Sequence, residues 1–213
     1  MKTAPAGQLG FDGLLASAAE QNHKRKVERE TAHLPATMAE GLAFFRLLIR
    51  QHHAAMLVAD VETTMRLRKE ADLLALRLNG DDSGILADKD SAGNVLARET
   101  AAAPGTVPLW GQEGEFTITV NGTPIRIQMD GMFGIGCSYL YWPGFAARAV
   151  DRERPFISET GYRSFLGIHA EPLPGLTPDA FAEKLIAAHI ARALRGKLVA
   201  IEPRYSHRRE GAP

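Results

Sequence analysis

The residues best suited to chemistry are concentrated between residues 152 and 169. Hydroxyl, carboxylate, guanidinium and imidazole groups alternate there with apolar anchors. The candidate ligand-binding set is Ser158, Glu159, Tyr162, Arg163, Ser164 and His169. Arginine offers a planar fork that matches a carboxylate or phosphate, and tyrosine adds a hydroxyl. We therefore predict a polar ligand or partner site in this segment.

Several interpretations of this segment stay open. One is a soluble, non-catalytic binding or regulatory protein that holds a small polar or anionic ligand. Another is an enzyme that acts on a small anionic substrate through the same residues. A Ser–His–acid triad lacks support, because no strained Gly-x-Ser-x-Gly elbow surrounds Ser158 or Ser164. The simplest alternative is a turn whose polar groups satisfy one another. The sequence therefore identifies no catalytic residue.

Two basic segments, residues 24–29 and 204–209, are candidates for contacts with nucleic acid. Acidic residues are interleaved with the first segment and dilute its field. The whole chain has 25 Lys and Arg residues against 25 Asp and Glu residues, so its net charge gives no general attraction to phosphates. Weak nucleic-acid binding through these two segments remains an alternative function.

Two sequence patterns resemble metal-binding sites, but neither provides a suitable set of ligands. His52 and His53 are adjacent, so on a helix they point about 100° apart and cannot chelate one ion together. His52 falls on the apolar face of its helix, so we expect these to be buried or boundary histidines. Residues 88–99 come close to a calcium loop, but Ala92 stands where an oxygen ligand is required. We expect a short hairpin or a loop there, and neither a metal nor another cofactor.

Cysteine content and hydropathy indicate the compartment. The only cysteine, Cys137, cannot form an intramolecular disulfide, and it most resembles a small buried apolar group. No stretch reaches the roughly 18 uninterrupted apolar residues of a membrane span. We therefore expect a cytoplasmic protein with no membrane partner.

Residues 11–80 are predicted to be helical. A charged helix runs from Phe11 to about His33, and Pro35 ends it. Thr37 and Glu40 form a capping box before an apolar helix that reaches residue 58. A further helix, capped at Asp60 or nearby, covers residues 60–79. It either forms a hairpin with the helix before it or continues that helix with a kink. We expect the apolar faces of these helices to be buried, either against the β-rich part or against a second copy of the chain.

Residues 81–112 are predicted to be a loop or linker that can include a short hairpin, with Ile85–Ala87 returning as Val95–Ala97. Residues 113–203 follow as a β-rich α+β domain, and residues 204–213 as a basic tail. Asn121-Gly122 predicts a two-residue turn that pairs Phe116 with Ile127 on the apolar face and Thr117 with Arg126 on the other face.

The end of the β-rich domain predicts a strand, a helix and a strand in succession. The strand is expected from Tyr162 to His169, the helix begins at Thr177-Pro178, and Leu198–Ile201 forms the last strand. The expected fold is therefore α+β, with N-terminal helices packed on a mainly antiparallel sheet and a C-terminal β-α-β crossover.

Overall fold

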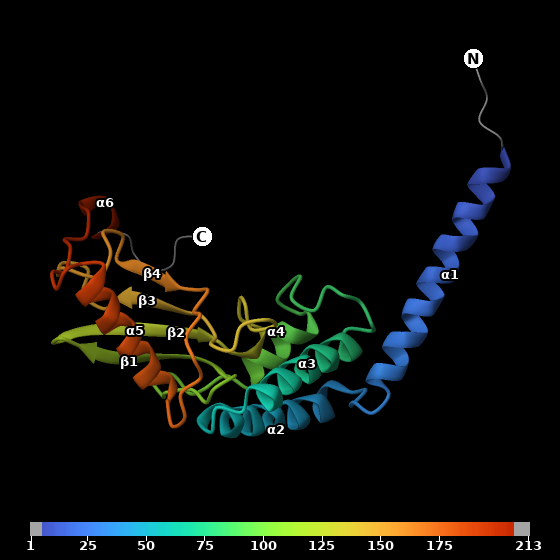
Figure 1. Ribbon diagram of the computed structural model, residues 1–213, viewed down its shortest axis with the longest axis horizontal. Coiled ribbons are helices and arrows are strands. Elements are labelled where there is room, and N and C mark those ends of the chain that lie inside the picture. The colour runs from blue at the N-terminus through green and yellow to red at the C-terminus, as the bar shows by residue number, and fades with distance from the viewer. Residues whose placement is uncertain (1–5, 207–213) are drawn as a thin grey trace, which may run out of the picture.

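The structure is a computed structural model, and it describes residues 6–206. The elements, in chain order, are α1 (Ala6–Thr31), α2 (Met38–Leu57), α3 (Val61–Leu78), α4 (Ala92–Glu99), β1 (Glu113–Val120), β2 (Thr123–Asp130), a short 3-10 helix (Gly131–Phe133), β3 (Phe145–Ala149), β4 (Tyr162–Phe165), α5 (Pro178–Arg192) and α6 (Pro203–Ser206). Helices come first and an antiparallel sheet follows (Figure 1). The predicted α+β class is confirmed.

The four strands form one sheet in the order β1-β2-β3-β4, and every neighbouring pair is antiparallel. Strands β1 and β2 are the predicted hairpin, in which Phe116 pairs with Ile127. Asn121 and Gly122 have φ values of 50° and 78°, as this type of two-residue turn requires. Because turn and alternation agree, the apolar side chains of both strands reach the same face.

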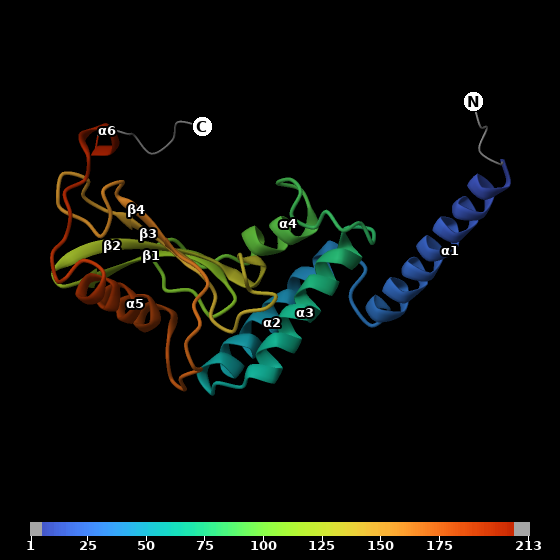
Figure 2. The same ribbon diagram turned by 45° about the horizontal axis from the view of Figure 1, so that its top comes forward.

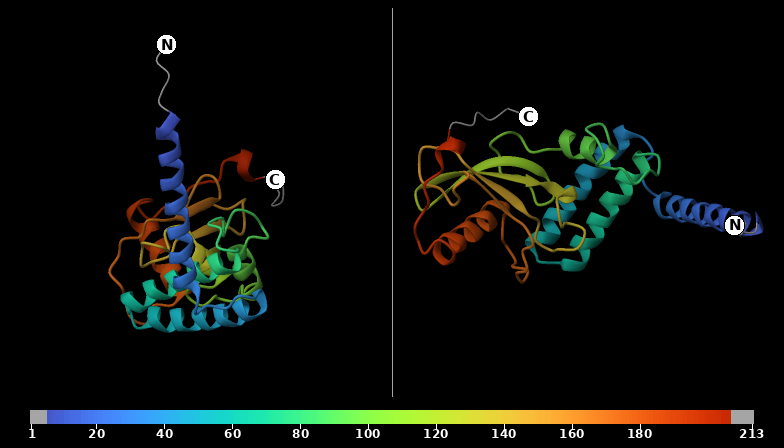
Figure 3. Two further views of the ribbon diagram at one scale, coloured as in Figure 1. Left: turned by 90° about the vertical axis from the view of Figure 1, so that its right-hand side faces the viewer. Right: turned by 90° about the horizontal axis from the view of Figure 1, so that it is seen from above.

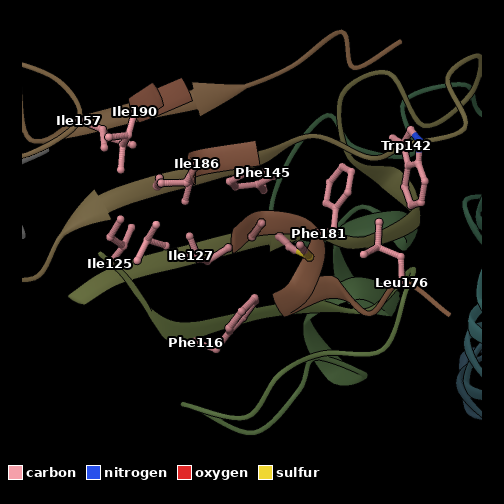
Figure 4. Packing of buried hydrophobic residues seen from close by; sticks show 14 of the residues in the cluster. Phe116, Ile125, Ile127, Trp142, Phe145, Ile157, Leu176, Phe181, Ile186 and Ile190 are labelled. Carbon is pink, nitrogen blue, oxygen red and sulfur yellow. The ribbon is translucent and has the colours of Figure 1, made fainter. Parts of the chain in front are cut away.

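Helix α5 covers that apolar face of the sheet (Figure 2). Phe181 of α5 stacks on Trp142 with 4.8 Å between ring centroids, and it meets Trp110 edge-on at 5.3 Å. The core around these rings, drawn in Figure 4, includes Phe116, Ile125, Ile127, Phe145, Ile157, Leu176, Ile186 and Ile190. The opposite face of the sheet is left to polar side chains.

Helices α2 and α3 form a hairpin with a second core. Thr37 begins α2 as predicted, because its Oγ1 accepts from the amide of Glu40 at 3.4 Å and donates to the Glu40 carboxylate at 2.8 Å. Asp60 caps α3 by accepting from the amide of Thr63 at 3.0 Å. The second core contains Phe45, Leu48, Ile49, Leu67, Leu74 and Leu96.

The helical hairpin docks on the β-rich part through the backbone of Trp110. His53 Nδ1 accepts from the Trp110 amide at 3.1 Å, and His52 Nδ1 bonds the Trp110 carbonyl at 3.0 Å. Arg68 of α3, only 2% exposed, donates from Nε to His52 Nε2 at 2.9 Å. Its other nitrogens donate to the carbonyls of Cys137, Leu140 and Tyr141.

Helix α1 projects from the rest of the molecule (Figure 3). Its C-terminal end is anchored by Val27 and Thr31, which are buried. The described side chains from Leu15 to Lys26 are exposed. None of the helices between residues 6 and 206 combines the length and apolar character of a membrane-spanning segment.

Two local predictions need correction. The short hairpin expected at Ile85–Ala87 and Val95–Ala97 is wrong, because residues 92–99 form helix α4. Asp88 stabilises the turn before this helix, because its Oδ1 accepts hydrogen bonds from the amides of Asp90 and Ser91 at 2.8 and 2.9 Å. Leu96 is then buried in the helical core, and tertiary packing outweighs the weak local signal.

The end of the predicted crossover also differs from expectation. Leu198–Ile201 contributes one antiparallel bridge, between Val199 and Phe156, instead of a parallel strand. Phe156 and Val199 exchange both backbone hydrogen bonds, at 2.8 and 2.9 Å. Strand β4 ends at Phe165, earlier than the predicted His169. The sheet is therefore wholly antiparallel, and residues 198–201 close the core beside it.

Candidate binding face of the sheet

Ser158 and Thr160 organise the turn that leads into β4. Ser158 Oγ donates to the carbonyl of Tyr162 at 2.7 Å and accepts from its amide at 3.1 Å. Thr160 Oγ1 donates to the same carbonyl at 2.9 Å. Both hydroxyls are thus engaged with the backbone of Tyr162. Their effect is to fix the direction in which the Tyr162 side chain leaves the strand.

Strand β4 sends its side chains alternately to the two faces of the sheet. Tyr162 pairs with Arg148 and Ser164 pairs with Ala146, so both point to the open face. Arg163 pairs with Ala147 and points to the face covered by α5. There its guanidinium lies 5.5 Å from the centroid of the Phe165 ring.

The covered side also influences a histidine of α5. Burial, together with the positive charge of Arg163, lowers the pKa of His189. The ring of His189 meets Phe165 edge-on at 5.8 Å between centroids. Arg163 therefore belongs to the border of the core, away from the side chains of Tyr162 and Ser164.

Glu159 and His169 are exposed at other positions. The carbonyl of Glu159 accepts from the amide of Glu202 at 2.9 Å, which ties the turn to the segment before α6. His169 lies beyond the end of β4. The six predicted residues are therefore divided: two share the open face, one lies on the covered face and three border the strand. A single catalytic cleft built from Glu159, Tyr162, Arg163 and His169 does not follow from this arrangement.

The open face carries a row of four polar side chains, one from each strand. Thr117 of β1 is opposite Arg126 of β2, Arg126 is opposite Arg148 of β3, and Arg148 is opposite Tyr162 of β4. We call these four residues the arginine row. Sequence reasoning placed Arg126 on this face but could not supply Arg148, because only the β2–β3 register brings the two arginines together.

The two arginines of the row are held by neighbours. Arg148 places its guanidinium 4.8 Å from the centroid of the Tyr162 ring, within the range of a cation–π contact. Arg126 Nε lies 3.6 Å from Glu115 Oε1. Like charges directly opposite each other in an antiparallel pair are destabilising.

The open face is acidic at its other end. Glu113 is paired with Asp130, and both side chains leave the sheet on the open side. Burial raises the pKa of each carboxyl, and the charge of Asp130 raises the pKa of Glu113 further. The face therefore carries an acidic pair at the end near α4 and the two guanidinium groups of the arginine row at its centre.

A pocket of about 520 Å³ lies at the far end of the sheet from the acidic pair. Gly122, Thr123 and Pro124, at the turn between β1 and β2, line one side of it, and Arg154 and Lys197 contribute positive charge to its wall. The N-terminal segment 24–29 lies on α1, and of the basic segment 204–209 only residues 204–206 fall within the described residues.

A metal site finds no support in the part of the chain that the structure describes, where no three His, Cys, Asp or Glu side chains are grouped to hold an ion. His52 and His53 are engaged with the backbone of Trp110. In the stretch 88–99, α4 occupies most of the length that a calcium loop would need. Cys137 is a buried free thiol, and burial raises its pKa.

Comparison with known proteins relates the chain to proteins named KlcB. Residues 113–203 match the family described as the KlcB third domain. One relative, Protein KlcB of Escherichia coli, is 33% identical over 184 residues, which are 85% of this chain and 43% of the relative. A second Protein KlcB of Escherichia coli is 31% identical over 187 residues, or 87% and 39% of the two chains.

The chain thus spans about two fifths of the length of the curated relatives it matches. No solved structure is significantly similar to it. The matched family region contains the whole sheet and α5, and so includes all four residues of the arginine row.

Proposed function

We propose that the chain is a non-catalytic binding protein, and that the open face of its sheet holds an anionic group of a partner. The observation that carries the proposal is the direct pairing of Arg126 with Arg148 beside an exposed Tyr162. Planar guanidinium groups suit the oxygens of a carboxylate or phosphate.

The predicted site at residues 158–169 enters this proposal through Tyr162 and Ser164. Both lie on the open face, and the Ser158 hydroxyl fixes the start of their strand. Glu159 and His169 are exposed at the border, where a larger partner would reach them. The enzyme alternative needs four side chains in one cleft, and the opposite directions of Tyr162 and Arg163 count against it.

The test is a titration of the isotope-labelled full chain with sodium pyrophosphate, followed by NMR. We expect the Nε–Hε signals of Arg126 and Arg148 to shift together, along with backbone amides of β2, β3 and β4. The Nε–Hε signal of the buried Arg68 serves as an internal reference. Shifts limited to residues 24–29, or no shifts at all, would refute an anion site on the sheet.

We also propose a cytoplasmic location and self-association through the helical part. The single cysteine, buried and unpaired, fits a reducing compartment. The exposed length of α1 supports self-association, because a solitary helix gains little from packing. The corresponding measurement concerns the whole molecule and is described in the Discussion.

A further inference from the structure

We propose that a second copy of the chain docks on the free edge of β1, where the two β1 strands pair in antiparallel fashion around Ile118. This inference goes beyond the proposed anion site, because it concerns an edge of the sheet and not its open face. It also differs from self-association through α1, because the contact lies on another element.

Strand β1 forms one edge of the sheet and β4 forms the other (Figure 1). Along an antiparallel edge strand, every second residue points its amide and carbonyl away from the neighbouring strand. Glu115 belongs to this outward set, because its carbonyl accepts from the amide of Gly105 at 3.0 Å. Thr117 and Thr119 follow in the same phase, and both are exposed. Among the residues that the structure describes, their outward backbone groups have no hydrogen-bond partner.

The edge at β4 is protected where Tyr162 begins the strand. Gly161 accepts from an amide of β3 at 2.9 Å, so the backbone of Tyr162, the next residue, points outward. The hydroxyls of Ser158 and Thr160 occupy its amide and its carbonyl. Arg163 adds a charge to this short strand. Short, charged and covered edges are the usual means by which proteins prevent the addition of a further strand.

The open half of β1 has none of these protective features. From Thr117 to Val120 its sequence is Thr-Ile-Thr-Val, four consecutive β-branched residues without a charge or a proline. Such residues favour strands, and an exposed edge of this kind is a template for another strand. Ile118 is only partly buried on the side where α5 contacts β1, so pairing would remove more of its apolar surface from water.

A second β1 is self-complementary to this edge. With Ile118 opposite Ile118 of the other copy, Thr117 of each chain lies opposite Thr119 of the other. The four threonines then exchange amide and carbonyl hydrogen bonds across the new pair. Phe116 faces Val120 on the side of α5, so apolar residues meet apolar residues there. No like charges face one another in this register.

Neighbouring registers leave outward groups unused. If Thr117 lay opposite Thr117, Thr119 would meet Glu115, whose carbonyl is already held by the segment before β1. If Thr119 lay opposite Thr119, Thr117 would meet Asn121, which has left the strand with a φ of 50°. The register around Ile118 therefore satisfies both threonines of both copies, and the segment before β1 ends the pairing at Glu115.

The experiment follows sedimentation equilibrium and amide exchange with water, by NMR, of the full chain. Because edge pairing alone buries little area, about 0.05 to 1 mM protein is covered. Exchange at Thr117 and Thr119 is expected to slow as the monomer fraction falls, about twofold when half of the chains are paired. The amide of Ile118, which pairs with Ile125 inside the sheet, should exchange at one slow rate throughout.

Thr119→Pro tests the edge directly. It removes an outward amide without breaking a bond inside the sheet, because Thr119 faces Pro124 at a pair that exchanges no hydrogen bonds. Two interface bonds are lost, so at least about tenfold more protein should be needed to slow the amide of Thr117. Ser164→Pro is the matched control, since it removes an outward amide of β4 on the opposite edge, and it should respond as wild type.

Thr117→Lys combined with Thr119→Lys tests the same edge without proline. The double variant places lysines opposite lysines across the proposed interface, where like charges oppose pairing. It is expected to abolish the concentration dependence of exchange at amides 117 and 119. Leu15→Glu, on α1, should leave that dependence unchanged. Circular dichroism and thermal melting of each variant confirm that the fold is kept.

Three results would overturn the inference: a monomer at every concentration, exchange at Thr117 and Thr119 that does not depend on concentration, or equal effects of Thr119→Pro and Ser164→Pro. Association that Leu15→Glu abolishes and Thr119→Pro leaves intact would assign the contact to α1 and would overturn it as well. None of these results bears on the anion site, which the pyrophosphate titration tests separately.

Discussion

At the scale of single residues, the molecule depends on a buried arginine that bonds a neutral histidine. Arg68 donates to three backbone carbonyls and to His52 Nε2. Nε2 must therefore be an acceptor, and Nδ1 donates to the Trp110 carbonyl. Burial, with the Arg68 charge, lowers the pKa of His52 to about 3. The neutral ring is thus a requirement of the docked structure.

This pKa makes stability sensitive to acid. The unfolded chain binds a proton at His52 below about pH 6.5, whereas the folded protein does so only near pH 3, so stability falls as the pH drops through this interval. Between pH 7 and pH 5 we expect wild type to lose about 2 kcal/mol more than His52→Gln, which cannot titrate there. Urea denaturation at both pH values measures the difference. Equal losses in the two proteins would contradict it, and His169→Gln, at an exposed site, should behave as wild type.

Sequence reasoning found only half of this network. It placed His52 on the apolar face of its helix, where the structure buries it at 1% exposure. It could not find Arg68, because an arginine between Leu67 and Lys69 gives no local sign of burial. The acceptors that make burial tolerable lie about 70 residues further along the chain, in the loop 137–141.

At the scale of elements, predictions succeeded where the physical signal is local. The Thr37 cap, the Asp60 cap and the Asn121-Gly122 turn each act within four residues, and all three are present. Helix α4 was missed because its eight residues include Gly93 and Asn94, which are weak helix formers. Its stability comes from contacts with α2 and α3, which local sequence does not reveal.

The glycine in α4 provides the second prediction. Ala is a better helix former than Gly by about 1 kcal/mol, so propensity alone favours Gly93→Ala. A Cβ at Gly93 would, however, lie 2.8 Å from the carbonyl oxygen of Ile85, which is backbone and cannot rotate away. Such overpacking costs about 1–3 kcal/mol. We therefore expect Gly93→Ala to lower the melting temperature by about 2–4 °C.

The control for this prediction is a glycine with free space around it. A Cβ at Gly13 in α1 meets nothing within 4 Å. Gly13→Ala should increase the helical signal in circular dichroism and leave the main melting transition unchanged. A higher melting temperature for Gly93→Ala would contradict the prediction. It would show that the loop 85–91 moves away from the added Cβ, and that the gain in helix propensity exceeds the cost of overpacking.

The candidate site shows the same division between local and long-range information. Alternation along the predicted hairpin identifies Arg126 as a residue of the polar face, and Tyr162 was predicted as a site residue with no face assigned to it. The arginine row as a unit needs the β2–β3 and β3–β4 registers, which depend on the 14-residue connection from Gly131 to Gly144 and on the turn before Tyr162. No local pattern fixes these registers.

At the scale of the whole molecule, the docked body and the projecting helix differ in how they are stabilised. The sheet and α5 enclose one hydrophobic core, which also includes Met56 of α2, and the helical hairpin encloses a second. Most of α1 lies outside both of them, and Leu15 is 54% exposed. Three glycines in its first eight residues weaken it further. An isolated helix of this composition is only marginally stable in water. Packing against a second copy of the chain would therefore stabilise α1 more than any other element.

The last prediction follows from this difference and concerns hydrogen exchange. If the chain self-associates through α1, protection of amides 13–24 should rise with protein concentration over the range in which light scattering detects a larger species. Amides of β2 and α5 should keep a constant, high protection because they belong to the core. Leu15→Glu places a charge on the exposed helix and is expected to remove the concentration dependence without lowering protection of the core. Protection of α1 that is independent of concentration, together with a monomer at every concentration, would rule out self-association through this helix.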